Sequence, residues 1–275
     1  MATAEGAPAE NVLELKGVSK SFVNPDGRVF EAIKDVSLVV RDEPGVGEFR
    51  VVLGPSGCGK STILNIVAGL FFPTTGTALV RGAPVAGPGP DRGMVFQSYS
   101  SYPWLTVLDN VAFGLMLRGV PRRDREAAAR TWIKKVGLEG TEKKYPRQLS
   151  GGMRQRVAIA RTLAARPKII LMDEPFGALD VQTRLGMQNL INELWEEIEG
   201  TILFVTHDIA EAVYLGDKIH ILSAGPGTIV DEVTVDLPLH RTEDLKNTAR
   251  FRELETVVLD KIRKQAKGGN LRITT

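Results

Sequence analysis

The feature that most restricts the fold is a glycine-rich segment, GPSGCGKS, that runs from Gly54 to Ser61. A short apolar run at residues 49–53 precedes it, and apolar side chains at helical spacing follow it over residues 60–70. A strand, a loop of small residues and a helix in this order can enclose phosphate groups with backbone N–H groups. Lys60 adds a positive charge there, and the serine hydroxyl can bind Mg²⁺. The sequence therefore predicts an α/β fold with a phosphate-binding loop at the end of a central strand.

This loop and the residue after it are expected to contact a nucleotide. The residues are Gly54, Pro55, Ser56, Gly57, Cys58, Gly59, Lys60, Ser61 and Thr62. Cys58 is the only cysteine of the chain, so an intramolecular disulfide is excluded. We interpret it as a small side chain that fills the loop. The alternative is a redox switch, because a thiol beside Lys60 could have a lowered pKa.

Three residues at strand ends are candidates for the chemistry of the site. Asp173 and Glu174 end an almost wholly apolar segment, residues 168–172, which is typical of a parallel strand covered on both faces. At the carboxyl edge of such a sheet, Asp173 can hold Mg²⁺ and Glu174 can act as the general base that polarises water. His207 follows another apolar strand, residues 201–205, so we expect it to contact the γ-phosphate and Glu174. For all three the alternative is a structural role, as a strand end, a helix cap or a packed histidine.

A second anion site is predicted where Ser150, Gly151 and Gly152 precede a helical run at residues 153–165. Ser150 is a good N-cap, and the two glycines leave the first helical N–H groups open to an anion. The alternative is an ordinary capped helix. Since the chain already has a complete phosphate loop, we interpret the second site as one that receives the γ-phosphate of a nucleotide on another copy. This interpretation predicts a dimer that opens and closes.

Two further regions extend the core. Residues 12–15 and 30–40 alternate apolar and polar side chains around an Asn-Pro-Asp-Gly turn signal, which predicts an antiparallel N-terminal β-subdomain. A helical, amphipathic stretch from residue 106 to about 148 predicts an α-helical subdomain, inserted into the core over about 98–165.

These patterns divide the chain into three parts. We expect a disordered N-terminus at residues 1–11, a nucleotide-binding domain at 12–240 and a helical tail at 241–275. Apolar residues at helical spacing in the tail indicate packing against the domain, with a dedicated regulatory element as the alternative. Within the domain, the helix that follows the last predicted core strand is expected to open with a capping box formed by Asp208 and Glu211.

Composition restricts the partners and the location. Lys and Arg total 35 against 33 for Asp and Glu, and a net charge of +2 gives no overall field for nucleic acid. No stretch reaches the ~18 apolar residues of a membrane span. The N-terminus also lacks the basic start and apolar core of a signal peptide. We therefore expect a cytoplasmic protein that binds no nucleic acid and reaches a membrane only through a partner.

With these motifs in this order, the chain resembles the nucleotide-binding subunits of ABC transporters over nearly all of residues 12–239. The resemblance implies the ABC ATPase fold, a P-loop NTPase core that uses ATP and Mg²⁺, and roles for three further residues. Gln97 is similar to the Q-loop glutamine that senses Mg²⁺ and the membrane subunit, and Asp180 to the D-loop aspartate at the dimer interface. Phe22 resembles the aromatic that stacks on adenine, with a core position as the alternative. The expected Mg²⁺ ligands are then Ser61, Gln97 and Asp173.

Finer features resemble the ATPases of nitrate, sulfonate and taurine importers, notably residues 103–111, 148–156 and 173–180. This resemblance implies an ATPase on the cytoplasmic face of the bacterial inner membrane. Its implied partners are a second copy, integral membrane permease subunits and, indirectly, a periplasmic or lipid-anchored solute-binding protein. The implied solute is a small oxyanion, a sulfonate or a related nutrient. Two segments depart from the family pattern, at 41–48 and 98–102, and the second bears on the identity of the membrane partner.

Three alternatives remain open. The ATPase of an exporter or lipid-transport system would share the catalysis and differ in partner and direction. A soluble ABC ATPase usually carries two cassettes or a long coiled-coil insertion, and neither pattern occurs in this sequence. A P-loop kinase would leave residues 150–152 and His207 without a function.

Overall fold

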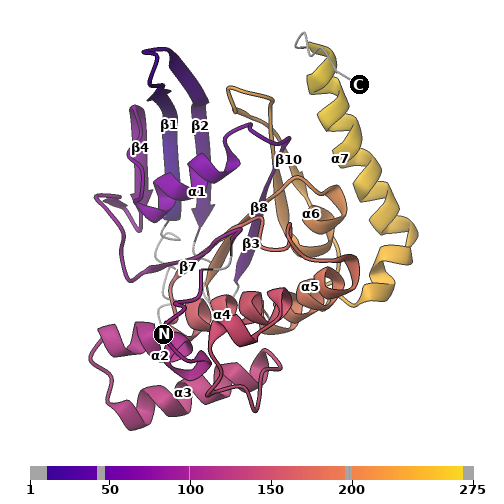
Figure 1. The fold of residues 1–275 in the computed structure, drawn as a ribbon. Helices are drawn as coiled ribbons and strands as arrows, with labels where there is room; N and C mark the ends of the chain where they lie inside the picture. The colour runs from indigo at the N-terminus through magenta and orange to yellow at the C-terminus, as the bar shows by residue number, and fades with distance from the viewer. Residues whose placement is uncertain (1–10, 42–46, 99, 196–197, 199, 269–275) are drawn as a thin grey trace, which may run out of the picture.

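A computed structural model describes residues 11–41, 47–98, 100–195, 198 and 200–268 (Figure 1). Most of the N-terminus expected to be disordered and most of the loop at 41–48 lie outside these ranges. The expected boundary is off by one residue, since Asn11 already belongs to the first strand. The last residues of the expected tail, after 268, also lie outside the description.

A six-stranded sheet lies at the centre, with the strand order β10-β9-β3-β8-β7-β6. Its strands are β3 (Glu48–Leu53), β6 (Arg92–Val95), β7 (Ile169–Asp173), β8 (Thr201–Thr206), β9 (Lys218–Leu222) and β10 (Ile229–Thr234). All pairings are parallel except that of β10 with β9 at one edge. Every residue of β7 and β8 is buried, as expected for strands covered on both faces. The register pairs Leu53 with Thr206 and Asp173 with Val205, so the carboxyl ends of three strands meet at one edge.

A second, four-stranded sheet is antiparallel and confirms the predicted N-terminal β-subdomain. In sheet order its strands are β2 (Val29–Arg41), β1 (Asn11–Val23), β4 (Thr75–Val80) and β5 (Ala83–Pro84). At the predicted turn between the first two strands of the chain, the N–H of Gly27 donates to the carbonyl of Asn24 at 2.9 Å. Helix α1 (Lys60–Ala68) connects the sheets, because its apolar face shares one buried cluster with strands of both.

The part of the chain that the structure describes contains six further helices. They are α2 (Val107–Leu117), α3 (Arg122–Lys135), α4 (Gly151–Ala164), α5 (Val181–Trp195), α6 (Ile209–Leu215) and α7 (Ala249–Gly268), with short 3₁₀ turns η1 (Pro146–Gln148) and η2 (Glu243–Asn247). Helices α2, α3 and α4 pack on one another at the end of the molecule away from the N-terminal sheet (Figure 1). The α-helical insertion of the expected fold is therefore present, and β7 resumes the core after it.

The C-terminal helix α7 packs along α6 and β10. Phe251, Leu254 and Val258 are buried in the larger core cluster, and Lys261 pairs with Asp231 of β10 at 2.6 Å. The apolar stripe predicted in the tail is therefore a packing face. Among the helices of the described ranges, none combines the length and the apolar character that crossing a bilayer requires.

Candidate nucleotide site

The phosphate loop joins β3 to α1 in a conformation that favours glycine. Gly57 and Gly59 have φ angles of 77° and 96°, in the left-handed region. A Cβ on Gly59 would lie 2.4 Å from Cγ2 of Ile33 and 2.7 Å from the carbonyl oxygen of Ala32, so a side chain has no room there. Gly59 is also the N-cap residue of α1, and a helix start without a side-chain cap leaves its first N–H groups available to an anion.

Cys58 lies inside this loop and is almost completely buried. Burial raises the pKa of its thiol, and the positive charge of Lys60 offsets that effect only in part. A buried thiol with a raised pKa forms little thiolate and reacts slowly. The structure therefore favours the predicted role of Cys58 as a filler of the loop over a redox switch.

The side chain of Lys60 is only 4% exposed and is held by three oxygen atoms. Its Nζ donates to the carbonyl oxygens of Gly54 at 2.9 Å and Pro55 at 3.0 Å. It also pairs with Oε1 of Glu174 at 3.2 Å. A phosphate group that binds in this loop must therefore compete with a carboxylate for the lysine.

Ser61 and Asp173 lie together at the edge where a metal ion is expected. The hydroxyl of Ser61 donates to Oδ1 of Asp173 at 2.8 Å. Burial raises the pKa of the Asp173 carboxyl, the charge of Glu174 adds to the rise, and the Ser61 hydrogen bond opposes it. A hydroxyl and a carboxylate oxygen fit Mg²⁺, which binds few protein oxygens and completes its shell with water and phosphate. Gln97, two residues after β6, lines the cavity over the phosphate loop together with Ser61.

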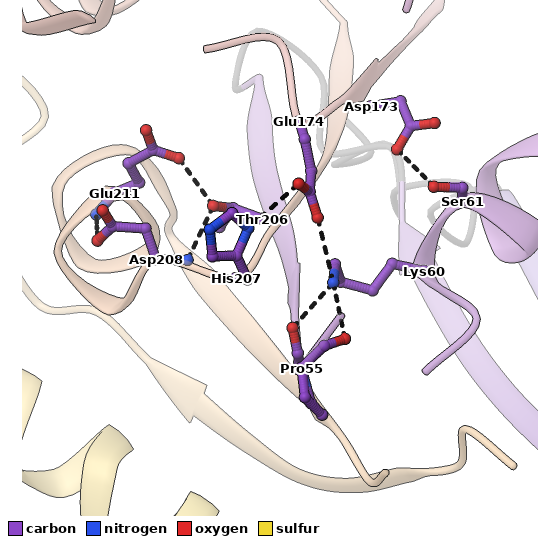
Figure 2. A network of polar contacts seen from close by, with 10 residues as sticks. Pro55, Lys60, Ser61, Asp173, Glu174, Thr206, His207, Asp208 and Glu211 are labelled. Carbon is purple, nitrogen blue, oxygen red and sulfur yellow. Dashed lines mark hydrogen bonds and ion pairs between the residues drawn. The ribbon is translucent and has the colours of Figure 1, made fainter. Parts of the chain in front are cut away.

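Glu174 connects the two halves of the site. Its φ angle is 39°, in the left-handed region that non-glycine residues adopt only when the surroundings fix them. Its N–H donates to the carbonyl of Val205 on β8 at 3.1 Å. Figure 2 shows the result: one carboxylate oxygen meets Lys60, and Oε2 lies 3.1 Å from Nδ1 of His207. The predicted contact between Glu174 and His207 is present.

A cavity of about 350 Å³ lies over the loop. It is lined by Phe22, Phe30, Ala32, Ser56, Gly57, Gly59, Lys60, Ser61, Thr62, Gln97 and Glu174. Phe22 lines this cavity and belongs to neither buried cluster. Its ring is nearly perpendicular to that of Phe71, with the ring centroids 5.5 Å apart. The sequence interpretation missed Phe30. The signal that could have found it is the antiparallel register across the turn, which pairs Phe22 with Phe30.

The turn that carries His207 differs from the prediction in one contact. Oδ1 of Asp208 accepts from the N–H of Glu211 at 3.2 Å, which is half of the expected capping box. The other half is absent, because the N–H of Asp208 donates to Oγ1 of Thr206 at 3.0 Å. The carboxylate of Glu211 instead accepts from the same Thr206 hydroxyl at 2.7 Å. The strand-end threonine therefore replaces the backbone N–H as the partner of the glutamate.

The predicted second anion site lies apart from this cavity. Ser150 caps α4 by accepting from the N–H of Met153 at 3.3 Å and is exposed. Asp180 is exposed as well and accepts from the N–H of Thr183 at 2.9 Å, and that hydrogen bond lowers the pKa of the carboxyl. A Cβ on Gly152 would lie 2.6 Å from Cγ2 of the same Thr183. Within one copy, the starts of α4 and α5 thus lie next to each other, and neither lines the cavity over the phosphate loop.

Comparison with known proteins identifies similar sequences over most of the chain. The family described as ABC transporter matches residues 34–177. An uncharacterised ABC transporter ATP-binding protein of Methanocaldococcus jannaschii is 48% identical over 93% of this chain and 94% of its own length. The nitrate import ATP-binding protein NrtD of Synechocystis is also 48% identical, over 87% of this chain and 90% of its own. The taurine import ATP-binding protein TauB of Escherichia coli is 44% identical over 85% and 92%.

Solved structures extend the comparison to the fold. A dimeric bacterial ABC transporter cassette superposes with a TM-score of 0.71 and 36% identity, over 82% of this chain and all of that one. A dimeric cassette in a post-hydrolysis state bound to ADP and Pi gives a TM-score of 0.70 and 35% identity, again over 82% and 100%.

Proposed function

The chain belongs to the ABC transporter family of ATP-binding proteins, and from this premise we propose that it is the ATP-hydrolysing subunit of an importer. One observation carries the proposal: Lys60 and His207 both contact Glu174, which lines the cavity over the phosphate loop together with Lys60 and Ser61. The Ser61–Asp173 pair lies beside them. Relatives named for nitrate and taurine import are 48% and 44% identical to it. They favour import over the exporter, lipid-transport and soluble alternatives.

The residues of the cavity and His207 beside them have separate roles in this reaction. Lys60 and the N–H groups at the start of α1 bind the phosphates of ATP. Glu174 accepts the proton of the attacking water, and His207 holds Glu174 and contacts the γ-phosphate. Phe22, with Phe30 beside it, offers a ring face to the adenine. Before ATP binds, Lys60 and Glu174 neutralise each other, so the base is engaged until phosphate takes the lysine.

Ser61, Asp173 and Gln97 are the residues that would hold Mg²⁺. The ion supplies neutralisation of the charge on the phosphate oxygens. We expect Asp173→Asn to raise the Mg²⁺ concentration needed for half-maximal hydrolysis by about tenfold or more, because a neutral amide is a weaker ligand for a hard cation. Mg²⁺ titrations of the ATPase rate measure this, with Asp236→Asn on the C-terminal side as the matched control. Equal Mg²⁺ requirements for both variants would contradict the role of Asp173.

A second copy completes the site in this proposal. Gly151 and Gly152 begin α4 next to the exposed Ser150, and Asp180 is also exposed, so we infer that this helix start receives the γ-phosphate of a nucleotide held by the partner. Two such sites follow from two-fold symmetry, since each copy supplies one phosphate loop and one α4 start. The two solved cassettes compared above are dimeric.

The membrane partner is a permease subunit, and an aromatic group before α2 is its proposed contact. Trp104 is 70% exposed, and its ring lies 5.6 Å from that of Tyr102. Tyr102 packs in turn on Phe113 of α2 at 4.6 Å. Exposed aromatic side chains of this kind dominate binding at protein interfaces.

We expect Tyr102→Ala with Trp104→Ala to uncouple solute uptake from hydrolysis. Uptake into vesicles should fall about tenfold or more, because a truncated aromatic anchor commonly costs over ~2 kcal/mol of binding. The ATPase rate of the isolated subunit should stay within about twofold, since neither side chain lines the cavity. Leu117→Ala, at another exposed apolar side chain of the same subdomain, is the control. Unchanged uptake in the double variant would remove this contact.

The remaining details are also part of the proposal. The protein is placed on the cytoplasmic face of the inner membrane through its permease, and a periplasmic or lipid-anchored protein delivers the solute. The solute is a small oxyanion, a sulfonate or a related nutrient, by analogy with the relatives named for nitrate and taurine.

An affinity purification tests the function as a whole. Tagged Glu174→Gln with ATP and Mg²⁺ is recovered from detergent-solubilised membranes of the organism that makes the protein, and co-eluting proteins are identified by mass spectrometry. A multi-spanning subunit with a solute-binding protein supports the importer. A multi-spanning subunit of an export or lipid-transport system would replace it with the first alternative. Recovery of ribosomal or DNA-repair proteins would favour a soluble ABC ATPase.

A further inference from the structure

A buried polar network holds the turn that carries His207. We propose that Glu211, at the centre of this network, is a positioning residue for His207 in ATP hydrolysis, and that Lys246 of the C-terminal segment orients the network. The inference rests on the role proposed above for His207. It gives the C-terminal segment a function besides packing.

Glu211 is bonded to both neighbours of His207. Its Oε2 accepts from the hydroxyl of Thr206 at 2.7 Å, and its N–H donates to Oδ1 of Asp208 at 3.2 Å. The same Thr206 hydroxyl accepts from the N–H of Asp208 at 3.0 Å, which closes a ring of hydrogen bonds around the turn (Figure 2). Glu211 therefore contacts the residue before the histidine through its carboxylate and the residue after it through its backbone N–H, and the Thr206 hydroxyl links the two contacts.

His207 depends on this turn because packing does little to hold it. Its side chain is 54% exposed, and its contact across the site is the 3.1 Å approach of Nδ1 to Glu174. The ring position follows from the backbone between Thr206 and Asp208. A change of that backbone would move the ring away from the carboxylate, and small displacements of catalytic groups are costly.

The network continues from Glu211 to the C-terminal segment. Gln188 of α5 donates through Nε2 to Oε1 of Glu211 at 3.1 Å. Lys246 of η2 donates to Oε1 of Gln188 at 2.8 Å and lies over the Tyr214 ring at 4.1 Å. Because Lys246 can only donate, it requires the amide oxygen of Gln188 to face it and so turns the amide N–H group toward Glu211.

Burial makes the direction of these bonds important. Thr206, Gln188 and Glu211 are 1%, 3% and 7% exposed. Burial is the main cause of the raised pKa of the Glu211 carboxyl, which the Thr206 and Gln188 hydrogen bonds oppose. A buried carboxylate is costly unless its oxygens accept hydrogen bonds, so loss of either donor weakens the rest of the network.

A double-mutant cycle with His207 separates positioning from stability. We expect Glu211→Ala to lower the turnover of ATP about tenfold, with the KM for ATP changed less than about twofold, because Glu211 does not line the cavity. In a His207→Ala background the same change should cost less than about twofold, since its effect passes through the missing ring. Single-turnover cleavage of radiolabelled ATP keeps the slow variants measurable.

Three further variants test the contacts individually. Thr206→Val removes the hydroxyl while it keeps the shape of the buried side chain, and Lys246→Met removes the orienting charge. Both should lower turnover severalfold, and Glu211→Gln should recover part of the loss of Glu211→Ala. Lys261→Met is the matched control, because it makes the same substitution in the C-terminal segment at an ion pair with Asp231 outside the network. It should leave turnover within about twofold of the unaltered protein.

The outcomes separate failure of the positioning role of Glu211 from failure of the role proposed for His207. If His207→Ala hydrolyses ATP at the unaltered rate, the role proposed for His207 is wrong. If His207→Ala is slow but Glu211→Ala costs the same factor in both backgrounds, Glu211 contributes stability alone and the positioning role is wrong. Normal turnover of both Thr206→Val and Glu211→Ala would also overturn it, and Thr206→Val decides if the alanine variant does not fold.

Discussion

Glu174→Gln is expected to bind ATP and to lose hydrolysis by about 10²- to 10⁴-fold, the range of general-base contributions. The amide keeps the shape of the carboxylate but cannot accept a proton from water. Because the cycle stops before hydrolysis, two copies should remain closed around ATP. Light scattering in excess ATP and Mg²⁺ should report the mass of a dimer, and rapid-quench assays should report the lost rate.

The same substitution should strengthen ATP binding before any chemistry. Glu174 pairs with Lys60 at 3.2 Å, and phosphate must displace it from the lysine. An amide competes less well, so we expect the affinity for ATP to rise severalfold. Titrations in EDTA make the comparison, since hydrolysis is then absent from both proteins.

A matched control substitution tests whether the effects on ATP affinity and hydrolysis are specific to Glu174. Glu48→Gln removes a carboxylate that pairs with Arg50 at 2.6 Å, at the end of β3 remote from the phosphate loop. It should change neither affinity nor rate by more than about twofold. A Glu174→Gln protein that binds ATP yet stays monomeric in excess ATP and Mg²⁺ would contradict the closed dimer. Residual hydrolysis near the unaltered rate would remove Glu174 as the base.

The sequence predicted the parts of this site that depend on chain order along parallel strands. The glycine positions of the phosphate loop follow from local backbone geometry. Asp173 is the last residue of β7 and His207 follows β8, and parallel pairing brings those strand ends together without further information. Gln97 was identified by resemblance, and its place at the cavity follows from β6, the next parallel strand.

Contacts that depend on three-dimensional packing could not be predicted from the sequence. The left-handed φ of Glu174 and its pairing with Lys60 depend on how the chain leaves β7 beside β8. The prediction of a capping box at Asp208 was wrong in one of its two hydrogen bonds. The N–H of Asp208 donates to the hydroxyl of Thr206 and not to the side chain of Glu211, which the spacing of Asp208 and Glu211 does not reveal. Lys246 joins the network only because the C-terminal segment folds back onto α5, which a pattern of apolar residues cannot specify.

Gly151→Asp is expected to abolish ATP-driven dimerisation while each copy still binds ATP. Gly151 is the first residue of α4, next to the exposed N-cap Ser150. A negative charge at a helix start interacts favourably with the helix dipole, so the variant should keep its fold. The same negative charge repels an incoming γ-phosphate from the site that the α4 N–H groups offer. In a Glu174→Gln background, light scattering should report monomers, with ATP affinity within about threefold of the parent.

Whether Gly151→Asp impairs ATP binding by the monomer or only dimerisation shows which copy's nucleotide the start of α4 contacts. Arg122→Asp is the control, because it places an acid at the start of α3 in the same helical subdomain, where Arg122 is exposed and pairs with Glu126. That variant should still dimerise. If Gly151→Asp instead lost ATP binding as a monomer, the start of α4 would contact the nucleotide of its own copy, against its separation from the cavity within one chain. Normal binding with lost dimerisation requires the contact to cross between copies, because a residue that leaves the monomer's affinity unchanged can act on the nucleotide only in the assembled pair.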